Sequence, residues 1–312
     1  MSREAGLRMI SEICKALVLS LWIAIKRPGA AAVDITNRCN LRCKHCYWWE
    51  QGHPQELDDR DMVQLFRRLK TQGMRAAILY GGEPALRLDV CRAATEIFDG
   101  VLVFTNGTLG LPELGSGQWI VSLDGSKEVN DKIRGQGVFD SAVESIKRAP
   151  IPPIVHMTIS RLNAACLEDF VREMLELPIK GMGFSFFTPI RGLDQQDLII
   201  PIEERKGVVK RLLALREKYG ERVGFTRAMA RQVLADGSFS SWNSYERCPV
   251  SKGLQCYRAD GTRKLCTYGD DADCSQCGCA AVAVYRGALY PPNYETMRLI
   301  LGLTSPGFLP KR

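Results

Sequence analysis

Features that mark several classes of protein are missing from this sequence. Its 312 residues include no basic block resembling a nucleic-acid-binding arm, although 42 lysines and arginines against 35 acidic residues give a net charge of +7. Internal repeats of the solenoid kind are also absent. A content of 46% hydrophobic and 25% charged residues excludes a disordered, collagenous or low-complexity chain. The sequence therefore predicts a globular protein with no nucleic-acid partner.

The amino-terminal segment lacks both a cleavable signal peptide and an apolar run long enough to cross a bilayer. A span needs about 20 apolar residues, and the clean stretch here, residues 16–25, has roughly half that number. Lys26-Arg27-Pro28-Gly29 follows it and is typical of a helix end. Residues 7–25 predict a helix that packs on the protein's own core or lies in the plane of a membrane. We expect a cytoplasmic protein, to which the second alternative adds peripheral contact with the inner face of the membrane; a true span is the third alternative.

Cysteine, in contrast, is abundant and clustered. A secreted disulfide scaffold is short and evenly studded with cysteine, whereas this long chain has 12 cysteines, most of them in two groups. Clustered thiols in a cytoplasmic protein indicate metal binding. The first group is Cys39, Cys43 and Cys46; the second is Cys248, Cys256, Cys266, Cys274, Cys277 and Cys279; Cys14, Cys91 and Cys166 are expected to be buried core thiols.

Short apolar runs alternate with amphipathic segments over much of the chain. The runs cover residues 31–36, 76–80, 101–105, 119–123, 154–159 and 183–187, and the helical segments cover residues 61–69, 88–98, 139–148, 167–175 and 203–219. Strands that alternate with helices predict a parallel sheet with right-handed crossovers. Six such units are too few for a closed TIM barrel. The expected fold class is α/β, a partial (βα)6 TIM-like barrel whose chemistry lies at the carboxyl ends of the strands.

The composition changes after residue 235. Residues 236–279 are rich in Gly, Asp, Ser and Cys and show little helical periodicity, so this small unit needs a metal to stabilise its core. The predicted parts are an amino-terminal helix over residues 1–29, the partial barrel over 30–235, a cysteine-rich auxiliary domain over 236–285 and a tail over 286–312.

The first cysteine group has the spacing C-x3-C-x2-C in one tight loop after the first predicted strand. Three soft thiolates can hold three irons of a [4Fe–4S] cluster, which leaves the fourth iron open to a small molecule. An open position favours a catalytic cluster over one that only carries electrons. The alternative is a zinc loop completed by His45 or by a distant cysteine.

This loop resembles that of the radical S-adenosylmethionine (radical SAM) enzymes, whose motif C-x3-C-x-aromatic-C is formed here by Cys39, Cys43, His45 and Cys46. The resemblance implies that S-adenosylmethionine chelates the open iron. It further implies that one electron cleaves the sulfonium and that the resulting 5′-deoxyadenosyl radical abstracts hydrogen from a substrate. The implied partners are an electron donor such as flavodoxin or ferredoxin and a substrate of unresolved class, so the enzyme is an oxidoreductase or a transferase.

Other segments carry the resemblance further, over roughly residues 31–279. Gly81-Gly82-Glu83-Pro84 is similar to the family's glycine-rich segment, and Ser122-Leu123-Asp124-Gly125 with residues 131–135 is similar to members with auxiliary clusters. The resemblance implies that the two glycines let backbone approach the methionine moiety and that the glutamate accepts from its ammonium group. The serine or the aspartate would bind the ribose hydroxyls, and an arginine would pair with the methionine carboxylate. The implied cofactor-binding residues are His45, Gly81, Gly82, Glu83, Ser122, Asp124 and Arg134.

The second cysteine group resembles a twitch or shortened SPASM auxiliary-cluster domain. Cys248 and Cys266 flank a C-x12-G-x4-C arrangement in which Gly261 suits a hairpin turn. The resemblance implies one auxiliary [4Fe–4S] cluster, because the seven-cysteine SPASM pattern is absent. Its implied ligands are Cys248, Cys266, Cys274 and Cys277, while Cys256 and Cys279 are left over and either could replace one of the four. A structural zinc site is the alternative.

The substrate is less well defined by the sequence. Aromatic residues at 47–49 and 184–187 fall near the expected mouth of the barrel. Together with the amino-terminal helix and the basic charge, they favour a lipid or isoprenoid-like substrate. A peptide is the second hypothesis, because family members with auxiliary clusters often modify peptides, and a sugar or other small metabolite is the third. No separate cobalamin-binding domain is evident. Two non-enzyme alternatives are an iron–sulfur electron carrier and a membrane-bound scaffold with structural zinc.

Overall fold

A computed structural model describes residues 29–234, 248, 250, 253–289 and 293–304. The helix expected over residues 7–25, with its alternative of a membrane contact, and Cys14 lie outside these residues. No helix within the described part of the chain has the length and apolar content needed to cross a membrane.

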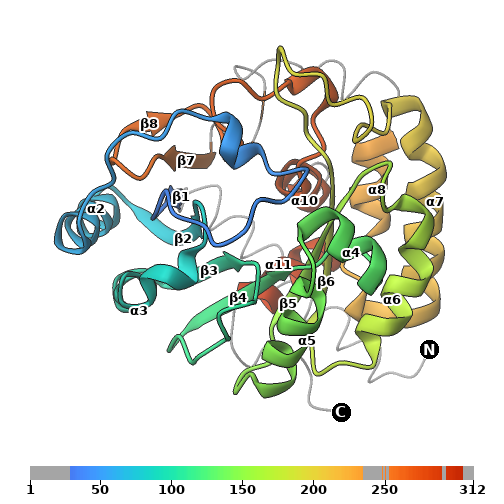
Figure 1. Ribbon diagram of the computed structural model, residues 1–312, viewed down its shortest axis with the longest axis horizontal. Coiled ribbons are helices and arrows are strands. Elements are labelled where there is room, and N and C mark those ends of the chain that lie inside the picture. Colours follow the sequence, from blue (N-terminus) through green and yellow to red (C-terminus); the bar gives the residue numbers. More distant parts are fainter. Residues whose placement is uncertain (1–28, 235–247, 249, 251–252, 290–292, 305–312) are drawn as a thin grey trace, which may run out of the picture.

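The centre of the protein is an eight-stranded sheet with the strand order β6-β5-β4-β3-β2-β1-β7-β8 (Figure 1). Neighbouring strands pair in parallel from β6 to β7, and only β7 and β8 are antiparallel. The barrel strands are β1 (Gly29–Asp34), β2 (Met74–Tyr80), β3 (Gly100–Thr105), β4 (Gly117–Ser122), β5 (Ile154–Ile159) and β6 (Gly181–Phe186). The predicted partial barrel of six parallel strands is confirmed, with four strands starting two residues earlier than their apolar runs.

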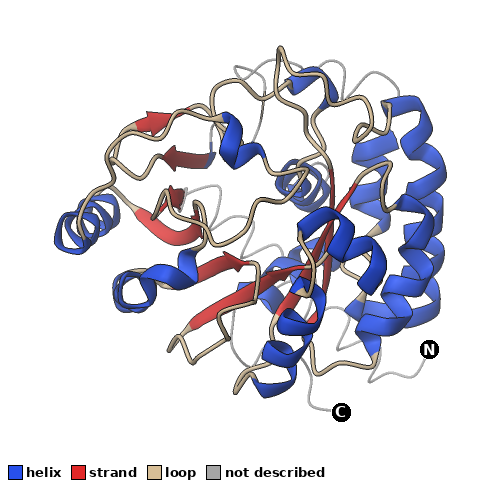
Figure 2. Ribbon diagram, in the orientation of Figure 1, coloured by secondary structure: helices blue, strands red, loops and turns tan. Residues whose placement is uncertain are grey.

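Helices cover the outside of this curved sheet (Figure 2). They are α2 (Asp59–Thr71), α3 (Leu88–Ile97), α4 (Lys127–Arg134), α5 (Val138–Arg148), α6 (Leu167–Leu175), α7 (Ile202–Tyr219) and α8 (Arg227–Leu234). Helix α2 shows why they form: Asp58 caps its start by accepting from the Asp61 N–H at 2.8 Å, and its apolar residues at helical spacing are all buried. Helix α4 was not predicted, because its sequence KEVNDKIR is mostly polar and lacks an apolar stripe.

Alternation along the strands separates the core from the inside of the barrel. In β3, Val101 and Val103 belong to the main hydrophobic core. Phe104 follows Val103 in the strand, so its side chain lies on the opposite face of the sheet. In β5, Val155 and Met157 are core residues, so the intervening His156 has the opposite orientation. The inner face of the sheet therefore carries aromatic and polar side chains toward the carboxyl ends of the strands.

The cysteine-rich segment is joined to the barrel through the sheet. Strand β7 (Leu254–Tyr257) pairs in parallel with β1, and β8 (Arg263–Lys264) returns beside β7 as the predicted hairpin. Gly261 in the turn has a φ of +80°, a left-handed conformation that favours glycine. This extension of the sheet was not foreseen, because pairing with β1 is non-local and β7 has no long apolar run.

Two helices follow where a tail was expected from residue 286. Helix α10 (Ala280–Leu289) packs on α8 and contacts β6, and α11 (Tyr294–Thr304) comes next. Arg216 pairs with Glu295 at 2.8 Å, and the Thr296 hydroxyl lies 2.7 Å from that of Thr226. These buried and half-buried contacts fix α11 to the barrel, so residues 286–304 differ from the predicted tail. The domain boundaries themselves stay predictions.

Candidate active site

The first cysteine group lies on the loop that follows β1, at the carboxyl ends of the parallel strands. Cys39, Cys43 and Cys46 are half-buried and form no disulfide. The N–H of Cys46 donates to the Cys43 carbonyl at 3.1 Å, and the N–H of Leu41 donates to Cys39 Sγ at 3.4 Å. The loop thus turns back on itself and brings the three predicted cluster ligands together.

Burial keeps these thiols protonated when no metal is bound. It is the main reason that the pKa of Cys39 is raised to about 11 and that of Cys46 to about 12, and the nearby Cys43 contributes to both rises. Among the described residues, no group of three or more His, Cys, Asp or Glu side chains is arranged to hold a single metal ion. The set of three thiols fits a multi-iron cluster, in which each thiolate binds a different iron and the iron displaces the thiol proton.

A buried carboxylate stands beside this loop. Asp124 is completely buried, and its Oδ2 lies 2.6 Å from Arg134 Nε and 2.9 Å from His45 Nε2. Its Oδ1 accepts from the Thr158 N–H at 2.9 Å. Burial opposes ionisation, but the charges of Arg134 and His45 outweigh it and hold the pKa of Asp124 well below its usual range. Asp124 therefore positions the arginine and the histidine, and its implied contact with ribose stays a prediction.

Arg134 and His45 keep nitrogen atoms free for a ligand. Arg134 Nε faces Asp124, and its two terminal nitrogens make no hydrogen bond among the described residues. His45 Nδ1 is buried and has no partner there either. The cluster loop contacts the same helix end, because the Lys44 N–H donates to the Ile133 carbonyl at 2.8 Å. These nitrogen atoms without hydrogen-bond partners lie next to three thiols, and they fit a polar cofactor that carries a carboxylate.

The glycine-rich segment after β2 packs directly on the cluster loop. The Gly82 N–H donates to the Thr36 carbonyl at 2.9 Å, and the Glu83 N–H donates to the Arg38 carbonyl at 2.8 Å. A Cβ on Gly82 would lie 2.1 Å from the Arg38 carbonyl oxygen. Gly81 has a φ of +122°, and a Cβ there would lie 2.5 Å from the Thr36 carbonyl oxygen. Both glycines are required by this close approach of two backbones, and their contact with the methionine moiety stays a prediction.

Glu83 connects the carboxyl ends of strands β2 and β3. Its buried carboxylate accepts from the Ala85 N–H at 2.9 Å, the Thr105 hydroxyl at 2.7 Å and the Asn106 N–H at 2.7 Å. Desolvation raises its pKa, and these three donors oppose the rise. The hydroxyl of Ser122, at the end of β4, makes no hydrogen bond among the described residues. The cofactor contacts of Glu83 and Ser122 therefore stay predictions.

Sequence reasoning missed a polar pair on the inner face of the sheet. His156 Nε2 lies 3.0 Å from Ser185 Oγ, and burial lowers the pKa of His156 to about 4. The His156 ring meets the edge of Phe104 at 5.6 Å between centroids, and Phe104 stacks on Tyr80 at 4.7 Å. The signal was available: a histidine alternates with core residues in β5, which places it inside the barrel.

The predicted ligands of the auxiliary cluster also come together. The pKa of Cys277 is raised to about 12, mainly by burial, and the neighbouring Cys248, Cys266 and Cys274 contribute to the rise. Four neighbouring thiols are the donor set of a tetra-cysteine cluster, although among the described residues they are not arranged around a single metal ion. The Cys279 N–H donates to Cys277 Sγ at 3.5 Å, so a fifth thiol is adjacent.

Cys256 has an apolar surrounding, in which burial raises the pKa of its thiol to about 12 and Cys266 contributes to the rise. It lies in β7, is 2% exposed and packs with Ala32 and Leu254 in a small apolar cluster. Of the two cysteines left over by the motif, only Cys279 lies beside Cys277, so Cys279 is the better substitute ligand.

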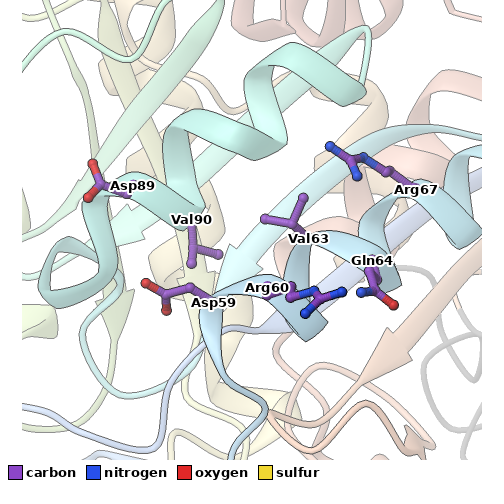
Figure 3. A pocket seen from close by; sticks show the side chains of 7 residues that line it. All are labelled: Asp59, Arg60, Val63, Gln64, Arg67, Asp89 and Val90. Atoms are coloured by element: carbon purple, nitrogen blue, oxygen red, sulfur yellow. The ribbon is translucent and has the colours of Figure 1, made fainter.

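A recess on the outer helical layer lies between α2 and α3 (Figure 3). Its volume is about 440 Å³, and Val63 and Val90 line it together with charged and amide side chains. Asp59 at this recess is paired with Arg87 at 2.5 Å. No cysteine lines it, so it is not part of the candidate active site.

Comparison with known sequences agrees with this geometry. The sporulation killing factor maturation protein SkfB of Bacillus subtilis (strain 168) is 32% identical over 161 residues, which are 47% of this chain and 39% of SkfB. The mycofactocin maturase MftC of Mycobacterium tuberculosis (strain ATCC 25618 / H37Rv) is 33% identical over 159 residues, which are 46% of this chain and 41% of MftC. This chain therefore matches only about two fifths of the length of these curated relatives.

Solved structures share the fold beyond that region. Streptococcus suis SuiB bound to S-adenosylmethionine superposes with a TM-score of 0.63 and 13% identity, covering 87% of this chain and 68% of SuiB. The anSMEcpe structure with bound AdoMet and the Cp18Cys peptide has a TM-score of 0.58 and 16% identity, covering 89% of this chain and 84% of that one. The match to a family described as the radical SAM superfamily spans residues 33–174. Residues 33–174 of this chain therefore belong to the radical SAM superfamily.

Proposed function

We propose that this chain is a radical SAM enzyme whose Cys39, Cys43 and Cys46 hold a catalytic [4Fe–4S] cluster. When bound, the cluster and S-adenosylmethionine supply reductive cleavage of the sulfonium and a 5′-deoxyadenosyl radical that takes hydrogen from the substrate. The observation that supports this most is the packing of the three-thiol loop against both the glycine-rich segment and the Asp124–Arg134 pair.

The chain's own residues would hold and orient the cofactor. The free terminal nitrogens of Arg134 match a carboxylate, and Asp124 fixes the guanidinium from behind. Glu83 keeps the glycine-rich segment against the cluster loop through its contacts with the β3 exit. Reduction would come from an acidic electron carrier such as flavodoxin or ferredoxin.

We further propose an auxiliary [4Fe–4S] cluster on Cys248, Cys266, Cys274 and Cys277. The mutual effect of these thiols on the pKa of Cys277 supports their proximity. Structural zinc is the second candidate for this site, because four thiolates suit either metal.

A peptide substrate is as well supported as the lipid or isoprenoid-like one that the sequence favoured. SkfB and MftC are named as a maturation protein and a maturase, and one structure shows SuiB bound to the precursor peptide SuiA. The SuiB complex covers 89% of this chain with a TM-score of 0.61. The lipid hypothesis depends on residues 7–25, which lie outside the described part of the chain.

The test is anaerobic reconstitution followed by chemical reduction. Iron and sulfide content separates a cluster protein from a zinc protein, and formation of 5′-deoxyadenosine from S-adenosylmethionine separates an enzyme from an electron carrier. We expect the product from the native chain and none from Cys43→Ala. Cys166→Ala is the matched control, because its half-buried thiol donates to the Asn163 carbonyl and is not one of the predicted ligands. Equal product from native protein and Cys43→Ala, or none from either, would overturn the proposal.

A further inference from the structure

A buried cation lies beside the second cysteine group. Arg205 of α7 is 2% exposed, and its guanidinium donates to the carbonyls of Cys277 at 2.7 Å and Gln276 at 2.8 Å. Its Nε donates to the Ile200 carbonyl at 3.0 Å, and the group lies over the ring of Phe186 at 5.1 Å. Every hydrogen bond that Arg205 makes among the described residues therefore goes to a neutral carbonyl oxygen.

No carboxylate in the described part of the chain forms an ion pair with Arg205. Glu203, exposed on the same helix, favours the charged form of the arginine but does not pair with it. The neighbouring Glu204 pairs with Arg161 at 3.3 Å, and the carboxylate of Asp273 caps its own short helix. A buried charge without a counter-charge is costly in a protein interior.

The hydrogen bonds alone do not account for this charge, because neutral donors could satisfy the same three carbonyls. Burial lowers the pKa of Arg205 to about 10, so the guanidinium still carries its proton at neutral pH. Iron and sulfide held by four thiolates form an anion, and an anion at the second cysteine group would supply the counter-charge. Arg205 contacts the backbone of one of the proposed ligands, Cys277.

Close packing on β6 fixes the segment that carries Cys277. The Phe186 N–H donates to the Gly278 carbonyl at 2.9 Å, and the Gly278 N–H donates to the Thr188 hydroxyl at 2.8 Å. A Cβ on Gly278 would lie 2.1 Å from the Phe186 carbonyl oxygen, so the two backbones are in direct contact. The arginine and the proposed ligand are thus held at a defined separation.

That separation is short enough for the charge to act on a cluster. Covalent bonds keep a cysteine sulfur within about 5 Å of its own carbonyl oxygen, so Cys277 Sγ lies within about 8 Å of the guanidinium. Arg205 is buried and Cys277 is half-buried, and salt screens such charges less than exposed ones. A positive charge at this distance favours the state of a cluster that holds one more electron.

We propose that Arg205 raises the reduction potential of the auxiliary cluster, because its buried positive charge stabilises the reduced form next to the ligand Cys277. The inference rests on the auxiliary cluster of the proposed function, and it adds the residue that sets how readily this cluster takes up one electron. Arg205 acts through Cys277, so it is a positioning residue and not a catalytic one.

The test is a redox titration, followed by EPR, of the full chain carrying Cys43→Ala, in which the auxiliary cluster alone remains. Dithionite is oxidised and supplies the one electron that each cluster takes up. Arg205→Lys keeps the charge, whereas Arg205→Gln keeps an amide donor for the carbonyls and loses the charge. We expect Arg205→Gln to lower the equilibrium constant for reduction by roughly tenfold, which is about 59 mV for a one-electron couple, and Arg205→Lys to change it by less than about threefold.

The matched control is Lys206→Gln in the same Cys43→Ala chain. It removes a positive charge from the next position of α7, where the side chain is exposed and solvent screens the charge. We expect it to leave the potential unchanged. Iron content is measured before each titration, and loss of iron from Arg205→Gln but not from Arg205→Lys would likewise show that the cluster needs the charge.

Two results would overturn the role of the charge. One is an unchanged potential in Arg205→Gln. The other is a loss of potential or of iron in Arg205→Lys as large as that in Arg205→Gln, which would leave Arg205 a purely structural role. Zinc in place of iron in the native chain would instead remove the auxiliary cluster of the proposed function, and the inference with it, so metal analysis distinguishes the two failures.

Discussion

The two cysteine groups differ in how the chain assembles them. The first group has its three thiols within one short loop, and backbone hydrogen bonds from the glycine-rich segment hold this loop in place. The second gathers thiols from residue 248 to residue 277, and contacts with the barrel hold them from outside. The first is bordered by the polar groups of Asp124, Arg134 and His45, which suit an exchangeable polar ligand. Under the proposed function, the local motif with an open side would serve chemistry, whereas the dispersed set of four thiols would close around an auxiliary cluster.

A single arginine shows what holds the second group. Arg205 of α7 is 2% exposed, and it donates to the Cys277 carbonyl at 2.7 Å, the Gln276 carbonyl at 2.8 Å and the Ile200 carbonyl at 3.0 Å. Its guanidinium also lies over the ring of Phe186 at 5.1 Å. The segment that carries Cys274 and Cys277 is thereby fixed to the barrel.

The largest expected effect is on the first group. Gly82→Ala places a Cβ against the backbone carbonyl of Arg38, where neither side can yield cheaply. We expect the variant to lose the catalytic cluster and nearly all 5′-deoxyadenosine formation while keeping auxiliary iron. Iron content and product formation after reconstitution check this. Gly52→Ala is the control, because its Cβ would meet nothing within 4 Å. Normal product from Gly82→Ala would show that the close packing of the two loops is not needed.

The second prediction concerns the metal of the auxiliary segment. Cys277→Ala removes one of the four predicted auxiliary ligands, so we expect roughly half of the iron to be lost, as one of two four-iron clusters goes. Binding of S-adenosylmethionine at the first group should persist. Iron and zinc content by metal analysis checks the result. Unchanged iron with loss of zinc would replace the auxiliary cluster by a zinc site.

The third prediction tests the anchoring of the second group. Arg205→Met keeps the length of the side chain but leaves three buried carbonyls without their donor. We expect a loss of about 2–4 kcal/mol in the free energy of unfolding, measured by denaturant titration. The exposed Arg172→Met should change it by less than about 1 kcal/mol. Equal effects of the two substitutions would contradict the anchoring role.

The smallest expected effect is a dependence of the protein's stability on pH, caused by His156 inside the barrel. The folded pKa of His156, about 4, lies below the ordinary value, so the unfolded chain takes up the proton first as the pH falls. Stability should therefore decrease between about pH 6.5 and pH 4, at no more than about 1.4 kcal/mol per pH unit from this group. His156→Gln should flatten that part of the profile, as thermal unfolding across this range would show. An unchanged slope would mean that His156 is not held neutral by burial.

Much of the fold was predictable because its determinants are local. The six barrel strands and most covering helices have periodic apolar residues, and the cluster loop is a contiguous motif. Helix α4 was missed because its sequence is polar, and α11 because the presence of proline and glycine in the last residues suggested a tail. The pairing of β7 with β1 depends on residues more than two hundred positions apart, which spacing cannot reveal.

The candidate site was predictable to the same extent. The sequence predicted ligands in both cysteine groups; the structure places the thiols of each group near one another, and their role as ligands stays a prediction. The sequence did not show that Asp124 faces Arg134 and His45, because a strand exit and a helix end converge only in the folded chain.

One measurement directly tests the claim that the first cluster has an iron open to S-adenosylmethionine and that the second cluster does not. In Cys277→Ala, where the first cluster alone remains, the EPR spectrum of the reduced protein should change when S-adenosylmethionine is added. In Cys43→Ala, where the auxiliary cluster remains, the same addition should leave the spectrum unchanged. A response in Cys43→Ala, or none in Cys277→Ala, would contradict the division of the two cysteine groups.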